Sequence, residues 1–213
     1  TVVSNAVGII SNSATVNSVT VGPVSHTVEA GTISAVKTSG TAIYSPNGTI
    51  VYTLTIENTG NGFAESIPVI DNISAIQTTL VGGGTGSAFL PGWTITASTT
   101  GTGTTSGSFA TGANLNTTIT IAPNGSVTYT ITGTVVATAV GQINNFATVN
   151  DIDTNTVSHI SAASEISATK TSGTTIYTPN GNIIYTLTIE NTGTGFAQSV
   201  PVVDAISSIQ TTL

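Results

Sequence analysis

Hydrophobic and polar residues alternate along short segments of this 213-residue chain. In TIVYTLTIEN (49–58), Tyr52, Leu54 and Ile56 share one face and Thr53, Thr55 and Glu57 share the other, as expected for a half-buried strand. The same alternation recurs in SVTYTITGTVVA (126–137), LNTTITIA (115–122) and GWTITAST (92–99). No segment shows a convincing helical period. The pattern therefore predicts an all-β chain.

Turn signals separate these segments. SPNG (45–48) and APNG (122–125) combine a proline, which presets φ, with an Asn-Gly pair that tolerates positive φ. Many short strands with turns at intervals of about ten residues are typical of a two-sheet β-sandwich.

The sequence repeats itself at a fixed offset. TVVSNAVGIISNSATVN at the start matches TVVATAVGQINNFATVN, which begins at Thr134, so the period is 134 − 1 = 133. The offset holds without a gap to the last residue, and about two thirds of the 80 aligned positions are identical. A fixed period of this kind is typical of tandem domains. We expect residues 1–29 to be the last strands of one repeat, 30–161 a complete repeat and 162–213 the first part of the next.

Charge is scarce. Two lysines and no arginine face nine acidic residues, which gives a formal net charge of −7. This balance excludes nucleic acid and anionic membrane surfaces as expected partners, because both require clustered Lys or Arg. The chain has no cysteine, which excludes disulfides and thiolate metal sites. No apolar run approaches the roughly 18 residues of a membrane span, and no signal peptide is visible, so we expect no membrane insertion in this segment.

One longer pattern resembles a known family. SPNGTIVYTLTIENTGNGFAESIPVID (45–71), followed by APNGSVTYTITGTVVATAVGQINNFATVN (122–150), is similar to the conserved repeat domain of prokaryotic surface proteins, an Ig-like family. The resemblance covers essentially the whole period and implies tandem Ig-like sandwiches in extracellular stalks, adhesins or filaments. Expected partners are then other copies or repeats of the same chain. A Gly/Thr-rich insertion at 82–112 departs from the family pattern, and its loops could instead bind a glycan or a host surface.

Other candidate chemistry is weak. The glycine-rich stretches lack the lysine and helix of a phosphate loop, and no nucleophile motif is present, so we expect neither an enzyme nor a cofactor. His26 and His159 hold the same phase of the repeat, which favours an inter-domain packing or hydrogen-bonding role over metal binding. Phe89 and Trp93 are expected to fill the sandwich, with carbohydrate stacking as a minor alternative.

Two further kinds of site can be named from short motifs. Asp151, Asp153 and Asn155 place oxygen ligands at alternate positions and form a calcium candidate, although a solvated linker is the favoured interpretation. The acceptor pattern for N-glycosylation occurs at four positions, Asn47, Asn72, Asn116 and Asn124.

Lys37 is the more informative residue. Strand parity places Ile33, Ala35 and Lys37 on one face, and the apolar character of that face turns the lysine inward. The same argument turns Asp71 inward with Ile67 and Val69. It also turns Asn145 inward with its alternate neighbours Ile143 and Ala147. One lysine, one acid and one asparagine are thus predicted to meet inside the sandwich.

Two arrangements satisfy these residues. One is a buried Lys37–Asp71 ion pair with Asn145 completing the hydrogen bonds. The other is an isopeptide bond between Lys37 and Asn145, assisted by Asp71, which resembles the self-cross-linking Ig-like domains of bacterial adhesins and pilins. Partial copies of the site are expected at Lys170 with Asp204, and at Asn12.

Overall fold

Two four-stranded sheets form the centre of the chain in the computed structural model, which describes residues 1–3, 6, 8–206 and 209. The segments 1–29 and 162–213 predicted from the repeat therefore each include residues outside the described part. The first sheet contains β3 (Ile33–Ser39), β5 (Thr49–Asn58), β11 (Ser126–Thr134) and β9 (Thr94–Thr100) in that order. The second contains β10 (Leu115–Ile121), β6 (Ala64–Asp71), β13 (Thr148–Val149) and β14 (Ile152–Asp153). All pairings within these two sheets are antiparallel.

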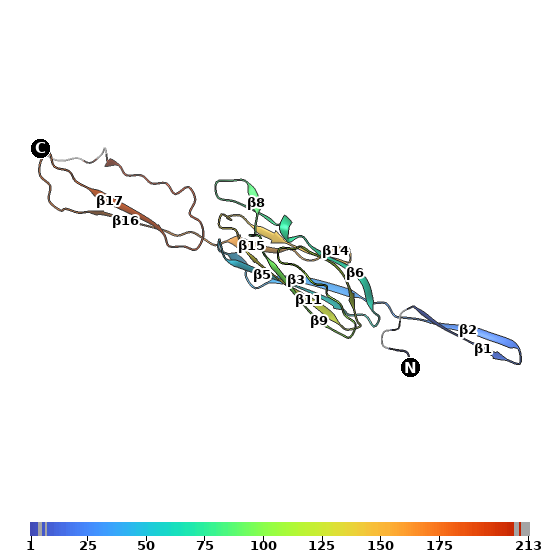
Figure 1. Cartoon of the computed structure of the whole chain (residues 1–213). Coiled ribbons are helices and arrows are strands. Elements are labelled where there is room, and N and C mark those ends of the chain that lie inside the picture. Colours follow the sequence, from blue (N-terminus) through green and yellow to red (C-terminus); the bar gives the residue numbers. More distant parts are fainter. Residues whose placement is uncertain (4–5, 7, 207–208, 210–213) are drawn as a thin grey trace.

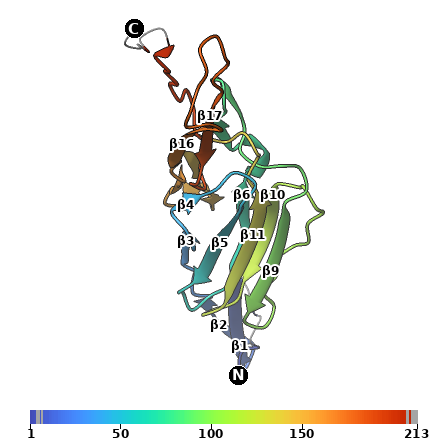
Figure 2. The same ribbon diagram turned by 90° about the vertical axis from the view of Figure 1, so that its left-hand side faces the viewer.

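A smaller sheet closes one end of the sandwich. It contains β12 (Ile143–Asn145), β15 (Val157–Ser161) and β4 (Ile43–Tyr44). Its β15–β4 pairing is parallel. A hairpin of β7 (Gln77–Thr79) and β8 (Thr85–Ser87) and the short 3₁₀ helix η1 (Ile73–Ala75) lie along the connections. Figure 2 shows the sheet of β3, β5, β11 and β9 in front of β6 and β10.

The predicted strands form where the alternation is strongest. The range predicted for 49–58 coincides with β5, whose even-numbered residues are buried throughout. The turns are confirmed as well: Gly48 and Gly125 each donate a backbone hydrogen bond to the residue three positions earlier, and Asn47 and Asn124 have positive φ. In β6, Ser66 has positive φ, and the pairing with β10 shifts register nearby, so that both Ala64 and Ile67 point inward.

The buried apolar side chains of the described residues lie between Tyr44 and Val149 and come from both large sheets. Leu54, Tyr129 and Leu115 have no exposed surface. Phe89 and Trp93 belong to this core, which confirms that they fill the sandwich, and the Trp93 indole N–H donates to the Ala113 carbonyl at 2.8 Å. An all-β sandwich with a continuous core is the result.

The 82–112 segment is more regular than the idea of an inserted loop suggests. It contains β8, and it contains β9, which pairs with β11 over seven consecutive residues. The strand predicted at 92–99 is therefore confirmed, and the glycine-rich stretches on either side of it are connections. This segment supplies an edge strand of the main sheet.

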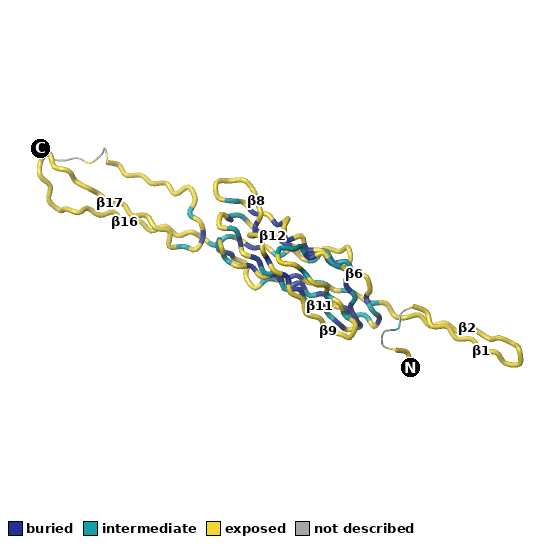
Figure 3. Tube along the Cα trace, in the orientation of Figure 1, coloured by how far each residue is buried: buried dark blue, intermediate teal, exposed yellow. Residues whose placement is uncertain are grey.

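Two ribbons extend from opposite ends of the sandwich, as Figure 1 shows. The first is the hairpin of β1 (Ile9–Val16) and β2 (Val19–Thr27), and the second contains β16 (Ile166–Ser172) paired with β17 (Tyr185–Asn191). Every residue of these four strands is exposed (Figure 3). The chain is thus elongated, with its buried core in the middle. The described residues include no helix with the length and apolar character that crossing a bilayer requires.

Candidate functional site

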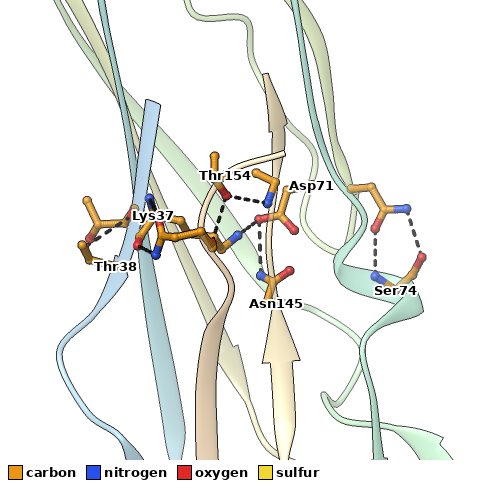
Figure 4. Close-up of polar contacts among 10 residues, drawn as sticks. Lys37, Thr38, Asp71, Ser74, Asn145 and Thr154 are labelled. Atoms are coloured by element: carbon orange, nitrogen blue, oxygen red, sulfur yellow. Dashed lines mark hydrogen bonds and ion pairs between the residues drawn. The ribbon is translucent and has the colours of Figure 1, made fainter. Parts of the chain in front are cut away.

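Lys37, Asp71 and Asn145 meet inside the sandwich, as strand parity predicts. Lys37 is on β3, Asp71 is the last residue of β6 and Asn145 is the last residue of β12. Their exposed fractions are 0%, 1% and 4%. Three strands from three different sheets therefore contribute one polar side chain each to a single buried point (Figure 4).

One carboxylate oxygen is the centre of this cluster. The Lys37 ammonium Nζ donates to Asp71 Oδ2, and the Asn145 amide Nδ2 donates to the same oxygen at 3.4 Å. The Lys37 Nζ also lies 4.9 Å from the centroid of the Tyr52 ring, within the range of a cation–π contact. Asp71 Oδ1 and the Tyr52 hydroxyl are buried, and neither makes a hydrogen bond with any of the residues that the structure describes.

Burial changes the protonation of both charged groups. Desolvation lowers the pKa of Lys37, and the neighbouring Asp71 opposes this shift only in part. Desolvation also raises the pKa of Asp71, against the opposing effects of Lys37 and the Asn145 amide. Both shifts favour a neutral amine beside a neutral carboxylic acid, because removing either charge from water is costly and the pair has few other partners.

Lys37 and Asn145 share one partner, because the Lys37 Nζ and the Asn145 Nδ2 both donate to Asp71 Oδ2. An amine and a carboxamide held at one carboxyl group can react if that group assists as an acid. An uncharged Lys37 Nζ has a free electron pair. Asn145 faces Asp71 with its Nδ2, so the amide must turn before a protonated Asp71 can donate a hydrogen bond to the Asn145 carbonyl oxygen and polarise it. The same three groups can also remain as a hydrogen-bonded ion pair. The arrangement thus permits either of the two outcomes expected from the sequence.

The second lysine forms a similar contact. Lys170 Nζ donates to both carboxylate oxygens of Asp204, at 2.8 and 2.7 Å, and lies 4.9 Å from the centroid of the Tyr185 ring. These three residues stand exactly one period after Lys37, Asp71 and Tyr52 (170 − 37 = 204 − 71 = 185 − 52 = 133). The side chains of the pair are partly exposed, at 38% and 33%. Asn12 is exposed on β1, with no lysine beside it among the described residues.

Asn155 holds the backbone of Lys37. Its amide Nδ2 donates to the Lys37 carbonyl at 2.7 Å, and its Oδ1 accepts from the Lys37 N–H at 3.0 Å. The side chain thereby replaces a neighbouring strand at the free edge of β3. The sequence pattern predicts Asn155 only as a ligand of the calcium candidate. Its position in an acidic stretch hid this role, and no local pattern could have revealed a contact across 118 residues.

The residues of the calcium candidate take part in contacts within the protein, and calcium binding itself stays a prediction. Asn150 and Asp151 have positive φ and form the tight turn between β13 and β14. Asp153 Oδ1 accepts a hydrogen bond from the Thr148 hydroxyl at 2.7 Å, and Asn155 is engaged with Lys37. No group of three or more His, Cys, Asp or Glu side chains that could hold a metal occurs among the described residues.

His159 is buried in the same region. It is 0% exposed, it pairs with Ile143 across β12 and β15, and its ring contacts Tyr52 edge-on at a centroid distance of 5.3 Å. The expectation of inter-domain packing is therefore wrong for His159, which fills the core of the sandwich. His26 is exposed on β2. Because both histidines sit at one phase of the repeat, sequence alone could not separate a domain end from a core position.

The remaining predicted positions lie on the surface or in the core. None of the four glycosylation candidates is buried, which a glycan acceptor requires, and their modification stays a prediction. These candidates are Asn47, Asn72, Asn116 and Asn124.

The aromatic side chains of the 82–112 segment, Phe89, Trp93 and Phe109, are buried or packed on the core. Phe89 and Trp93 therefore expose little ring surface on which a sugar could stack, whereas Phe109 is only partly buried.

Calcium removal should leave the domain intact. Asp153 and Asn155 already have hydrogen-bond partners within the protein, so a bound cation would have to displace them. We expect a chelator such as EDTA to shift the thermal midpoint of the sandwich negligibly, as measured by circular dichroism. A large decrease, restored by added calcium, would revive the site around Asp151 and Asp153.

The buried His159 makes stability depend on pH. Desolvation lowers its pKa below 6.5, although the Thr41 backbone opposes this. Below pH 6.5 the imidazole therefore binds a proton more readily in the unfolded chain than in the folded chain. The free energy of unfolding consequently decreases as the pH falls, by up to about 1.4 kcal/mol per pH unit. Asp71 has the opposite effect because its pKa is raised.

A pair of variants isolates the histidine. The His159→Phe variant should lose less stability between pH 7 and pH 5 than the wild type, as measured by chemical denaturation at each pH. Ser158→Ala, at the exposed neighbouring position, should show the wild-type pH dependence. Parallel profiles for the wild type and His159→Phe would show that His159 does not govern the acid response.

Known proteins provide no independent assignment. Neither a scan against protein-family models nor a search of curated proteins returns a match for this chain. The interpretation of function therefore depends on the buried site, on the repeat and on the elongated arrangement of the strands.

Proposed function

We propose that this protein is a structural component of an extracellular fibre or stalk, built from tandem Ig-like sandwiches that recur with the sequence period of 133 (134 − 1 = 133). Its role is mechanical: it builds filaments or presents an adhesive surface, and it has no catalytic turnover. The buried cluster of Lys37, Asp71 and Asn145 is the observation that carries this proposal. It joins β3, at the start of the sandwich, to β12, near its end.

The surroundings of the cluster support a mechanical role over a catalytic one. All three side chains are at most 4% exposed, so they offer little surface to a substrate in solution. The two charged groups of the cluster, Lys37 and Asp71, are partners of each other. The chain also enters the sandwich from one ribbon and leaves it toward another at the opposite end, so a pull on the chain would act along its length (Figure 1).

We further propose that Lys37 and Asn145 are joined covalently. The neutral Lys37 Nζ attacks Asn145 Cγ, a C–N bond forms, the bond from Cγ to Nδ2 breaks, and the nitrogen leaves as ammonia. Asp71 protonates and polarises the carboxamide and then accepts the surplus proton from the amine, so it returns to its initial state. Amine and carboxamide become a secondary amide and ammonia, and no oxidant or other reactant is needed.

The hydrogen bonds favour this outcome over a persistent ion pair. A buried ammonium has three donor hydrogens, yet Lys37 Nζ has one hydrogen-bond acceptor, Asp71 Oδ2, beside the Tyr52 ring. Asp71 Oδ1 has no donor. Charges left with so few partners cost several kcal/mol each, and amide formation removes the lysine charge altogether.

The bond would close the loop that runs from Lys37 to Asn145 (145 − 37 = 108). By analogy with a disulfide that closes a loop of about 100 residues, the chain-entropy model gives about 4 to 5 kcal/mol of stabilisation. In a chain without cysteine, an amide can supply a cross-link that no reducing agent would open.

Intact mass tests the cross-link. A complete domain should weigh about 17 Da less than its sequence mass, because one ammonia is lost per bond. The Asp71→Ala variant should recover the full mass, whereas Asp153→Ala, at an exposed acid, should keep the deficit. A deficit of about 18 Da would indicate loss of water and a bond to Asp71 instead. An unmodified wild-type mass would leave the ion pair as the role of the cluster.

Electron microscopy of the native material tests the function itself. A tandem array should form extended filaments whose axial repeat equals one domain or a small multiple of it. Compact, monodisperse globular particles from the full-length protein would contradict the proposal, whatever the mass measurement shows.

A further inference from the structure

The loop that follows β5 contacts the segment that precedes β3. This loop, Asn58–Gly62, has the sequence NTGNG, and NTGTG occurs one period later at Asn191–Gly195, where β17 ends (191 − 58 = 133). The first loop lies against residues 29–32 and the second against residues 162–165. We call the two loops the Asn-Gly loops and the two contacted segments the linkers.

The hydrogen bonds between loop and linker are the same in both places. Asn58 Oδ1 accepts from the N–H groups of Thr32 and Gly60, at 2.9 and 3.0 Å. Asn191 Oδ1 accepts in the same way from the N–H groups of Glu165 and Gly193, at 3.2 and 3.1 Å.

Backbone bonds add to this match. The N–H of Thr59 donates to Thr32 O, and that of Thr192 donates to Glu165 O, both at 2.8 Å. The N–H groups of Gly62 and Gly195 donate to Ala30 O and Ala163 O, at 3.4 and 2.9 Å. These four hydrogen bonds therefore recur at the same offset, although three of the four linker residues differ between the two copies and only Ala30 and Ala163 match.

The glycines of the loops leave no space for a side chain. A Cβ on Gly62 would overlap the carbonyl oxygen of Glu29, and a Cβ on Gly195 would overlap that of Ala162. Neither glycine has a positive φ, so an alanine could adopt the backbone conformation. Close approach of the linker backbone is what requires glycine at these positions.

The other end of each linker is held by the preceding element. The Ala162 N–H donates to Tyr44 O at 2.7 Å, one residue before Ala163 accepts from the next loop. At the first junction the Val28 N–H donates to Gly8 O at 3.3 Å, two residues before Ala30 accepts from Gly62. At most one linker residue therefore lies between the hydrogen bond to the preceding element and the hydrogen bond to the following loop.

Apolar side chains accompany both contacts. At the first junction a hollow is lined by Ile10 and Val28 of the hairpin side and by Phe63 and Pro123 of the sandwich. At the second junction the corresponding hollow is lined by Phe196, one period after Phe63, together with Pro46 and Ala137 of the sandwich, among others.

We propose that the Asn-Gly loop is a docking surface for the linker that enters its own domain, and that it fixes the orientation of each domain relative to the one before it. Its partner is the preceding repeat of the same chain. This inference rests on the tandem array proposed above. With the linker clamped, the array behaves as a stiff rod, whereas an unclamped linker of this length would let neighbouring domains swing freely.

Distances between spin labels test the clamp in the chain as it exists. The chain has no cysteine, so Thr15→Cys on β1 and Ser98→Cys on β9 place two nitroxide labels uniquely across the first junction. We expect a narrow distance distribution in the otherwise wild-type chain. Gly62→Ala should broaden it at least about twofold, toward the spread of an articulated linker.

The repeat supplies matched controls. Gly40 and Gly173 also differ by one period (173 − 40 = 133), and a Cβ on either would meet no atom within 4 Å. Gly40→Ala should therefore keep the narrow distribution. Should Gly62→Ala prevent folding of the sandwich, Gly195→Ala against Gly173→Ala, with labels at Ser98→Cys and Thr188→Cys, makes the same comparison at the second junction.

The outcomes separate this inference from the proposed function. A broad distribution in the wild-type chain, or equal widths for the clamp and control variants, would overturn the clamp. Filaments seen by microscopy together with that result would leave the fibre intact with flexible joints. Globular particles with a narrow distribution would overturn the fibre and keep the clamp as a local contact.

Discussion

The contact between Lys37 and Asp71 determines what the rest of the sandwich has to provide. A lysine with no exposed surface is tolerated only if its charge is matched or removed. The structure meets this demand by ending β6 on an acid, ending β12 on an asparagine and placing the Tyr52 ring beside the ammonium. Lys37, Asp71 and Asn145 belong to strands that neither neighbour each other in sequence nor pair with each other. The polar cluster therefore specifies how the sheets are positioned, which an apolar core alone would specify less sharply.

Strand parity was sufficient to predict the inward direction of Lys37, Asp71 and Asn145, because the period of two leaves only one alternative for each side chain. It was sufficient for β5 as well, where every second residue is buried. Strand parity could not predict the role of Asn155, whose side chain binds the Lys37 backbone across 118 residues. That contact depends on the path that the chain takes after β14, which brings Asn155 to the edge of β3. His159 was misassigned for a related reason: the repeat gives its phase, and only the sheet containing β15 and β4 shows that this phase lies in the core.

The Asn-Gly loops show a different limit of sequence reasoning. NTG was visible as part of a family-like pattern, but glycine is usually interpreted as a turn residue. The backbone conformation of Gly62 and Gly195 would accept alanine. The space beside the carbonyl oxygens of Glu29 and Ala162 is too small for the added methyl group. Asn58 is 1% exposed and also donates to the carbonyls of Gly62, Ile121 and Ala122, so a single side chain joins the loop, the linker and the neighbouring strands. The need for glycine at these positions can be recognised only from the structure, because it depends on how closely the linker backbone approaches the loop backbone.

If the two proposals hold together, they define a path for force along the chain. Tension that enters through the linker at Ala30 reaches β3 within a few residues and then Lys37. The proposed amide from Lys37 to Asn145 would carry it to β12, and from there the chain continues through β13 to β15 and Ala162, where the next proposed clamp would begin. In this arrangement the strands between Lys37 and Asn145, which include β5, β6 and β11, lie outside the loaded path. With the proposed cross-link in place, the sandwich would hold and dehydrate the amide, and its own hydrogen bonds would not need to resist the load.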